Sequence, residues 1–118
     1  MAEPGPCATA AAGVAARHVL RLVRILCVCD HGVNRSVHVA DQLRFRGHET
    51  IPVGAKHLSD ETRQLLSDWA DMAIFTGHGQ QELFPPVASE TWLLPEHPRP
   101  YAPATLQLVR GYIERSGL

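Results

Sequence analysis

Lysine is nearly missing from this sequence. Of the 11 Lys and Arg residues, Lys56 is the only lysine, and the formal net charge is −1. A chain with so little net charge creates no overall field that would attract nucleic acid or an anionic membrane. Any preference for an anion must therefore come from a local site, and the composition provides no broad basic surface for binding a polypeptide.

Long apolar runs are also missing, and none approaches the ~20 residues that a membrane-spanning helix needs. Residues 1–18 are rich in Ala, Gly and Pro and contain no Lys or Arg before Arg17, so they lack the basic start of a secretory signal. This composition favours a disordered leader over residues 1–18. The remaining residues, 19–118, are enough for one domain.

Cysteine is scarce and odd in number, with only Cys7, Cys27 and Cys29 in the chain. Cys27 and Cys29 lie in an apolar run, which does not suggest a disulfide framework. Free thiols are typical of a reducing compartment, so we expect a cytoplasmic protein.

The apolar residues change their spacing several times along the chain. Ile25–Cys29 reads I-L-C-V-C, a continuous apolar run that is typical of a strand buried on both faces. From residue 36 to Gly47 the spacing is helical and predicts one buried face. The residues expected on that face are Val37, Ala40, Leu43 and Arg44. Further strands are expected at 49–53, 71–76 and 90–94, and further helical segments at 59–69, 80–84 and 103–115.

Two of these elements carry more specific expectations. Pro52 cannot donate a ladder hydrogen bond, so its strand is predicted to lie at a sheet edge. Ser59 is predicted to cap the helix that follows it. The buried stripe of that helix is expected to consist of Leu65, Leu66 and Trp69.

Strands and helices thus alternate, which indicates a single α/β domain. We expect a four-stranded parallel sheet, in the order 2-1-3-4, with helices on both faces. Ligands of such sheets bind at the carboxyl ends of the strands. Cys29, Gly77 and Glu96 are each expected to emerge at that edge.

The loop after the first strand carries the most specific chemical signal. Backbone N–H groups between a strand and a helix, together with the helix N-terminus, can bind a phosphate-like anion. The same field favours the nucleophilic thiolate of Cys29 at the base of such a loop. The planar guanidinium of Arg35 can hold two phosphoryl oxygens at once. Ser36 can cap the helix and donate its hydroxyl to the Cys29 sulfur.

The other residues of the loop also suit an anion. Gly32 and Asn34 tolerate the positive φ angles that a tight anion-binding loop can require. The pattern Cys-x5-Arg-Ser, placed after an apolar strand and before a helix, is far more specific than any one of its residues. The loop residues expected to contact the bound group are Asp30, His31, Gly32, Val33, Asn34 and Ser36.

The stretch I-L-C-V-C-D-H-G-V-N-R-S, which ends at Ser36, resembles the active-site loop of the low-molecular-weight protein tyrosine phosphatase family. Its Asn34-Arg35-Ser36 ending is similar to that of the RNA polymerase C-terminal-domain phosphatases of the same superfamily. The run W-A-D-M-A-I-F at 69–75 resembles the start of a strand in small members. The resemblance covers residues 24–118 and implies a four-stranded parallel sheet.

The resemblance also implies a metal-independent phosphatase that acts in two steps. Cys29 would attack phosphorus and form a cysteinyl-phosphate, which water would then hydrolyse. No cofactor and no metal are implied, and the partner would be a phosphoprotein or a small phosphoester. Glu96 would stand where the family has its general acid, an Asp followed by Pro, and Tyr101 would line the substrate entrance.

The sequence departs from the family pattern inside and outside the loop. Gly32 replaces a common Asn, and Asn34 replaces a second Cys, so a protective disulfide within the loop is lost. Asp30 places a carboxylate next to the nucleophile. We expect it to face solvent, because an inward carboxylate would repel both thiolate and phosphate. The Glu at position 96 extends about 1 Å farther than an Asp would, enough to matter for proton transfer.

Other interpretations stay open. A catalytically weak or inactive phosphate-binding relative would account for Glu96. Arsenate reduction normally uses further cysteines, and none follows Cys29. A sugar phosphotransferase component carries phosphate on a loop cysteine, but Arg35 is unexpected there. A zinc or copper site is the last alternative. Its candidate ligands are Cys27, Cys29, His31 and His38.

The remaining aromatic and histidine residues are assigned mainly to structure. His97, beside Glu96, is a candidate for substrate contact, as is His31. His38 is expected at the surface or in packing, and Trp92 in the core. The histidines expected to be plain surface residues are His18, His48, His57 and His78.

Overall fold

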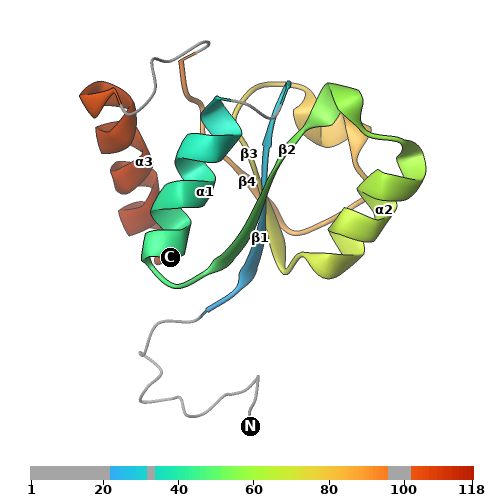
Figure 1. The fold of residues 1–118 in the computed structure, drawn as a ribbon, viewed down its shortest axis with the longest axis horizontal. Helices are drawn as coiled ribbons and strands as arrows, with labels where there is room; N and C mark the ends of the chain where they lie inside the picture. The colour runs from blue at the N-terminus through green and yellow to red at the C-terminus, as the bar shows by residue number, and fades with distance from the viewer. Residues whose placement is uncertain (1–21, 32–33, 96–101) are drawn as a thin grey trace, which may run out of the picture.

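The computed structural model describes residues 22–31, 34–95 and 102–118. The expected leader, residues 1–18, lies outside the described residues. Strands and helices alternate along the described chain (Figure 1). The elements are β1 (Arg24–Cys29), α1 (Arg35–Phe45), β2 (Glu49–Gly54), the 3₁₀ helix η1 (Ala55–His57), α2 (Asp60–Trp69), β3 (Met72–Phe75), the 3₁₀ helix η2 (Gln80–Leu83), β4 (Ser89–Thr91) and α3 (Pro103–Ser116). Within these ranges, no helix combines the length and the apolar character needed to cross a bilayer.

Strand β1 lies inside a four-stranded parallel sheet whose order is β2-β1-β3-β4. Residues 25–29 are all buried, because β1 has a strand on each side and helices over both faces (Figure 1). Strand β2, which contains Pro52, is an edge strand, where a missing proline N–H is tolerated. The α/β class and the strand order predicted from the sequence are both confirmed.

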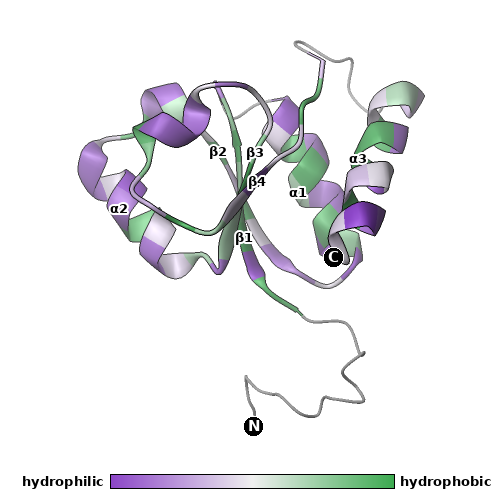
Figure 2. Ribbon diagram, turned by 180° about the vertical axis from the view of Figure 1, so that it is seen from behind, coloured by the Kyte–Doolittle hydropathy of each residue, from purple (hydrophilic) through white to green (hydrophobic). Residues whose placement is uncertain are grey.

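Side chains alternate along β1 and divide the core into two clusters, one on each face of the sheet. Ile25 and Cys27 pack with residues of α1 and α3, whereas Leu26 and Val28 pack on the side of α2. Figure 1 shows α1 and α3 together on one face, and α2 with both 3₁₀ helices on the other. The hydropathy colouring agrees, since the central strands are largely apolar and much of α2 is hydrophilic (Figure 2).

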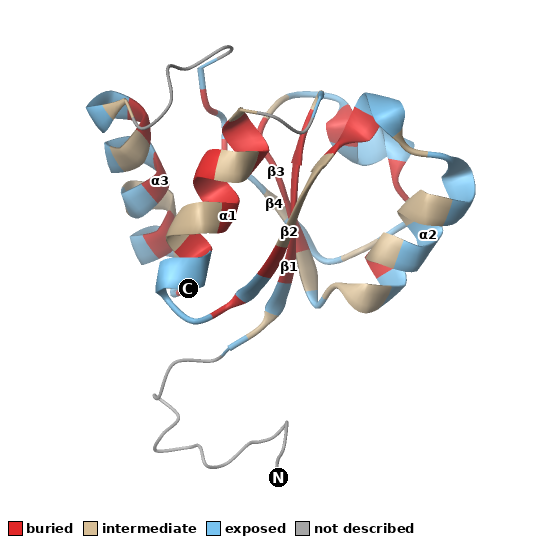
Figure 3. Ribbon diagram, in the orientation of Figure 1, coloured by how far each residue is buried: buried red, intermediate tan, exposed pale blue. Residues whose placement is uncertain are grey.

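Helix α1 has the largest buried share of the three α-helices (Figure 3). Its buried stripe differs from the predicted one, because Val39 lies in the core while Val37 is half-buried and Arg44 is exposed. The helix packs on the sheet and also against α3, so the stripe that faces both becomes buried. Gly47, with φ +97°, follows the helix and ends it as predicted. The apolar and small residues of the stripe are Ser36, Val39, Ala40 and Leu43.

Helix α2 covers its face of the sheet with only part of its surface. Ser59 caps the helix as predicted, and its Oγ accepts a hydrogen bond from the Thr62 N–H at 3.1 Å. Leu66 and Trp69 are half-buried, but Leu65 is 69 % exposed, so the predicted stripe is wrong at that residue. Neighbouring helical residues point about 100° apart, so Leu65 and Leu66 do not both face a narrow contact.

Strand β4 is shorter than predicted and ends at Thr91. The chain nevertheless continues beside β3, because the Trp92 N–H donates to the Phe75 carbonyl at 2.7 Å. The Leu94 N–H donates to the Thr76 carbonyl at 3.4 Å. Trp92 is 1 % exposed, which confirms its predicted place in the core. The last described residues before position 96 therefore follow the edge of β3.

His48 is buried, so its prediction as a surface residue is wrong. The Val23 N–H donates to Nδ1 of His48 at 3.1 Å, and Nε2 of His48 donates to the Leu118 carbonyl at 2.9 Å. One imidazole thus joins the segment before β1 to the segment after α3. Hydropathy patterns cannot reveal such a role, since it depends on two backbone partners that are distant in sequence.

We predict that His48→Ala lowers the free energy of unfolding by about 2 kcal/mol, because two hydrogen bonds are lost and their buried partners are poorly hydrated. Unfolding in urea measures the change. His78→Ala, at an exposed position after β3, is the matched control and should change stability by less than about 0.5 kcal/mol. A His48→Ala protein as stable as the wild type would contradict this role.

Candidate active site

Cys29 is the last residue of β1 and lies at the carboxyl edge of the sheet. Its side chain is 3 % exposed, and its Sγ lies 3.2 Å from Oγ of Ser36, within hydrogen-bonding distance. The Ser36 hydroxyl thus lies at the sulfur as predicted, but here the Cys29 thiol donates and Ser36 Oγ accepts. The predicted capping role of Ser36 is wrong, because α1 begins at Arg35 and Asn34 is the N-cap residue.

The N-terminus of α1 faces this loop without a side-chain cap from Asn34. The Asn34 carbonyl accepts the His38 N–H at 3.1 Å and lies 2.9 Å from Nδ1 of the same residue. His38 is buried, in agreement with its predicted packing role. The first N–H groups of α1 thus donate no hydrogen bond to the Asn34 side chain, and helix N-termini of this kind attract anions.

Arg35 is the first residue of α1, and its guanidinium is buried between two loops. Nη1 donates to the Thr76 carbonyl at 3.3 Å, and Nη2 lies 3.7 Å from Oδ2 of Asp30. Thr76 follows β3, whereas Asp30 follows β1, so the guanidinium bridges the ends of the two central strands. A cation and a thiol are thereby held at one edge of the sheet.

Asp30 does not simply face solvent, and that expectation is wrong. Its side chain is 34 % exposed, and Oδ2 lies 3.7 Å from Arg35 Nη2 and 3.8 Å from Nζ of Lys56. Oδ1 accepts a hydrogen bond from Nε2 of Gln80 at 3.0 Å. Two cations and an amide thus hold the carboxylate against the protein, so it is only partly exposed to solvent.

These contacts change the acidity of Asp30. The hydrogen bond from Gln80 lowers the pKa of its carboxyl group below the ordinary value of 3.8. Partial burial opposes this change, while the positive charges of Lys56, Arg35 and His31 lower the pKa further. Asp30 therefore stays ionised throughout the neutral and mildly acidic range, and it reduces the positive charge beside Cys29.

The sequence analysis missed Gln80, the first residue of η2, although the structure brings its side chain to the loop. Its Oε1 accepts from the Thr76 N–H at 3.1 Å and from the Gly77 N–H at 3.2 Å. Gln80 is 3 % exposed. The only sequence signal is a Gln directly after the Gly77-His78-Gly79 turn, and that signal is weak without the fold.

The 3₁₀ helix η1 lies beside the loop that follows β1. The Lys56 N–H donates to the Asp30 carbonyl at 3.0 Å. Nδ1 of His31 and Nε2 of His57 lie 2.9 Å apart, with ring centroids separated by 5.0 Å. Both histidines are exposed, so His57 is at the surface as predicted, yet it also fixes the position of His31. His31, His57 and Lys56 thus place two imidazoles and one ammonium group beside this loop.

Several predicted site residues lie outside the described residues. The predicted general acid Glu96 and its neighbour are among them, and Pro95 is the last described residue before them. The structure therefore brings together Cys29, Asp30, Arg35 and Ser36, and it places His31 against His57 and Asn34 at the N-cap of α1. It does not test the positions outside the described ranges. The predicted residues outside the described ranges are Gly32, Val33, Glu96, His97 and Tyr101.

The four residues of the metal alternative do not come together. Cys27 lies in the core on the α1 side, and burial raises the pKa of its thiol far above the ordinary value. His38 contacts Asn34, and His31 contacts His57. Within 22–31, 34–95 and 102–118, no group of three or more His, Cys, Asp or Glu residues could hold a metal ion.

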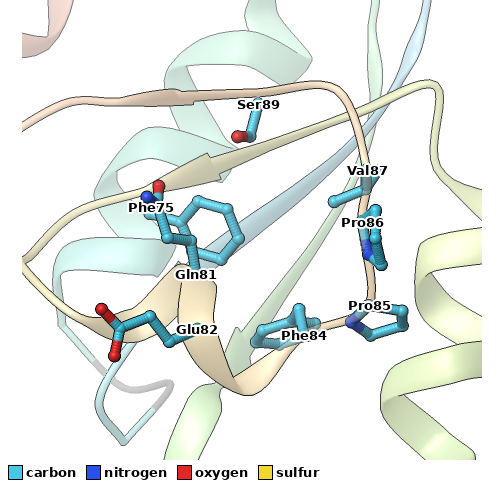
Figure 4. Close-up of a pocket in the computed structure, with 8 residues that line it drawn as sticks. All are labelled: Phe75, Gln81, Glu82, Phe84, Pro85, Pro86, Val87 and Ser89. Carbon is cyan, nitrogen blue, oxygen red and sulfur yellow. The ribbon is translucent and has the colours of Figure 1, made fainter.

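A shallow apolar pocket of about 310 Å³ lies elsewhere, between η2, β4 and the segment that joins them (Figure 4). None of its lining residues belongs to the Cys29 loop. Its lining residues are Phe75, Gln81, Glu82, Phe84, Pro85, Pro86, Val87 and Ser89.

Comparison of the chain with protein-family models, with curated proteins and with solved structures finds no match. The resemblance to the low-molecular-weight phosphatase family thus stays a prediction from the loop sequence. The structural evidence on function is the geometry of Cys29, Arg35 and Ser36.

Asp30→Asn should destabilise the folded protein at pH 7 by about 1 kcal/mol, because the charge that pairs with Arg35 and Lys56 is lost. Since the folded-state pKa lies below the ordinary value of 3.8, this stabilisation is present above about pH 4 and disappears as pH falls through the folded-state pKa. Urea unfolding of both proteins between pH 7 and pH 3 measures the difference. A difference that persists unchanged at pH 3 would contradict the ionic contacts.

Proposed function

We propose that this protein is a cysteine-dependent phosphatase that hydrolyses phosphomonoesters through a cysteinyl-phosphate on Cys29. The observation that carries the proposal is the 3.2 Å contact between Cys29 Sγ and Ser36 Oγ, at the sheet edge where the Arg35 guanidinium is buried. A hydroxyl that donates to sulfur stabilises a thiolate, and a guanidinium nearby favours both the thiolate and a phosphate dianion. Cys29 also leads into the N-terminus of an α-helix, which adds to the same field.

In the first step, the Cys29 thiolate forms an S–P bond while the bond between phosphorus and the leaving oxygen breaks. The electron pair of the broken bond stays on the leaving oxygen. A proton from the Glu96 carboxyl group neutralises that oxygen, so the alcohol or phenol departs uncharged. Arg35 holds the equatorial oxygens as charge moves between the two apical positions.

In the second step, water attacks phosphorus and the S–P bond breaks. The electron pair returns to the Cys29 sulfur, and Ser36 stabilises the thiolate that reforms. The Glu96 carboxylate accepts the proton of the attacking water, which releases inorganic phosphate and restores the acid. No electron transfer and no metal are required for either step, and the sequence resemblance supports the same scheme.

The substrate class is a phosphomonoester on a protein, with phosphotyrosine first among the residues, or on a small molecule. The low net charge of −1 does not support a nucleic-acid substrate. We also propose a cytoplasmic location, because the chain has only three cysteines and two of them lie in an apolar run, a usage typical of a reducing compartment.

A phosphate-binding protein with little or no turnover is the second candidate. The position of Asp30 favours it, because this carboxylate lies 3.7 Å from Arg35 Nη2 and, as the residue next to Cys29, disfavours the thiolate that turnover requires. The substitution of Glu96 for the family's Asp points the same way. Turnover, rather than phosphate binding, separates the two candidates.

Replacement of Cys29 by Ser should abolish hydrolysis of p-nitrophenyl phosphate, by more than about 10³-fold, because an alkoxide forms far less readily than a thiolate. Binding of inorganic phosphate, followed by calorimetry, should persist. Cys27→Ala is the matched control two residues earlier in β1, and it should cost about 1 kcal/mol of stability while activity remains. Hydrolysis that survives in purified Cys29→Ser would exclude the covalent mechanism.

Glu96→Gln should slow substrates with poor leaving groups more than substrates with good ones, by about 10²-fold for an alkyl phosphate, since only the former need a proton on the leaving oxygen. Rates on p-nitrophenyl phosphate and on an alkyl phosphate measure this. Glu114→Gln, an exposed position in α3, serves as the control. Equal rates on both substrates would remove Glu96 from the mechanism. Phosphate binding without turnover in every form would identify the binding protein instead.

A further inference from the structure

Two contacts hold the Arg35 guanidinium at the carboxyl edge of the sheet, one from the residue after β3 and one from the residue after β1. Nη1 donates to the Thr76 carbonyl, and Nη2 lies against the carboxylate of Asp30. Among the described residues these are the contacts of the guanidinium, and Nε takes part in neither. The two contacts thus restrain both terminal nitrogens of the guanidinium.

The Asp30 carboxylate is in turn held by a buried amide. Gln80 is 3 % exposed, and its Nε2 donates to Oδ1 of Asp30 at 3.0 Å. Its Oε1 accepts from the N–H groups of both Thr76 and Gly77, which fixes the orientation of the amide. The donor that faces Asp30 is therefore set by the backbone turn after β3. One continuous chain of contacts links that turn to the guanidinium.

Close packing at Gly77 is a second observation of the same arrangement. A Cβ at this position would lie 3.1 Å from Nε2 of Gln80 and 3.2 Å from Nη1 of Arg35. Both distances are tighter than ordinary carbon contacts. The Gln80 amide and the Arg35 guanidinium therefore both pack closely against the backbone of Gly77. Neither group can move closer to that backbone. Gly77 is needed for this close approach, although its φ angle is not in the left-handed region.

We propose that Gln80 and Asp30 are positioning residues for Arg35: the turn after β3 orients Gln80, Gln80 orients Asp30, and Asp30 orients the guanidinium toward the bound phosphate. This inference rests on the proposed function, because it assumes that Arg35 binds the phosphoryl oxygens. It assigns a role to two side chains whose described contacts are with each other and with Arg35, Lys56 and the turn after β3. Supporting residues of this kind set the geometry of a charged group to within about 0.5 Å.

The Gln80→Glu variant separates this positioning role from a merely structural one. Glutamate keeps an oxygen to accept from the Thr76 and Gly77 N–H groups, so the turn is preserved. Its second oxygen faces Asp30, where the wild type has an N–H donor. Two carboxylates at hydrogen-bonding distance do not both stay ionised without cost, so one of them binds a proton more readily than an isolated carboxyl group.

At neutral pH the added charge pushes Asp30 away and releases Arg35. At acidic pH a proton shared by the two carboxyl groups restores the hydrogen bond. The charged or titratable groups that face Asp30 are Arg35, Lys56 and His31, with His57 behind His31. These groups are the same in both proteins, so the ratio of variant to wild type at each pH reports on position 80.

The experiment measures dissociation constants of inorganic phosphate by calorimetry at pH 7.5 and pH 5.0, for wild type, Gln80→Glu and Gln80→Leu. Gln80→Glu should bind phosphate about 10-fold to 100-fold more weakly than wild type at pH 7.5. At pH 5.0 the difference should fall to about 3-fold or less, because the shared proton replaces the amide donor. Gln80→Leu, which has no group to protonate, should be equally impaired at both pH values.

Gln81→Glu is the matched control, because it introduces the same charge at the next residue of η2, where the side chain is exposed. It should bind phosphate like the wild type at both pH values. Unchanged binding by Gln80→Glu at pH 7.5, or an equal loss at both pH values, would overturn the positioning role. A wild-type protein that binds no phosphate would contradict the proposed function itself, which distinguishes the two failures.

Discussion

The pairing of β1 with a parallel strand on each side is the constraint on which the rest of this molecule depends. Residues 25–29 are buried by β2, by β3 and by helices over both faces. This pairing determines the register of β1 and therefore the residue at which the strand ends. It ends at Cys29, and α1 begins six residues later, over the same face that holds Cys27. The sulfur and the Ser36 hydroxyl are therefore brought together by the sheet and the helix packed on it.

The same pairing explains why the site combines residues from two distant segments. Because β1 and β3 are neighbours, the loop after one strand meets the turn after the other, and Arg35 reaches the Thr76 carbonyl. Asp30 and Gln80 meet by the same route. The contacts between the two segments are the Arg35–Thr76 and Asp30–Gln80 hydrogen bonds. Each involves a charged group that is at least half-buried. In such surroundings a small displacement of one member changes the field felt by the others.

Much of the architecture could be predicted because it depends on local patterns. The apolar run of β1, the cap at Ser59 and the end of α1 at Gly47 each depend on a few consecutive residues. The same is true of the loop that holds Cys29 and Ser36. The failures have different causes. His48, Asp30 and Gln80 owe their environments to partners far along the chain, whereas Leu65 is exposed because the contact face of α2 is narrow. No periodicity indicates which side chain will meet an amide 50 residues away.

That separation in sequence has a consequence for how the protein is made. The contacts between Asp30 and Gln80 and between Arg35 and Thr76 close loops of 50 and 41 residues. Loops of this length are costly to close early, so they form after local structure has assembled. During synthesis, a chain that has extended only through α2 carries the thiol and the arginine but not the turn that orients them. The arrangement of Arg35, Asp30 and Gln80 is therefore a property of the finished sheet, and an incomplete chain carries Cys29 without the turn that orients Arg35.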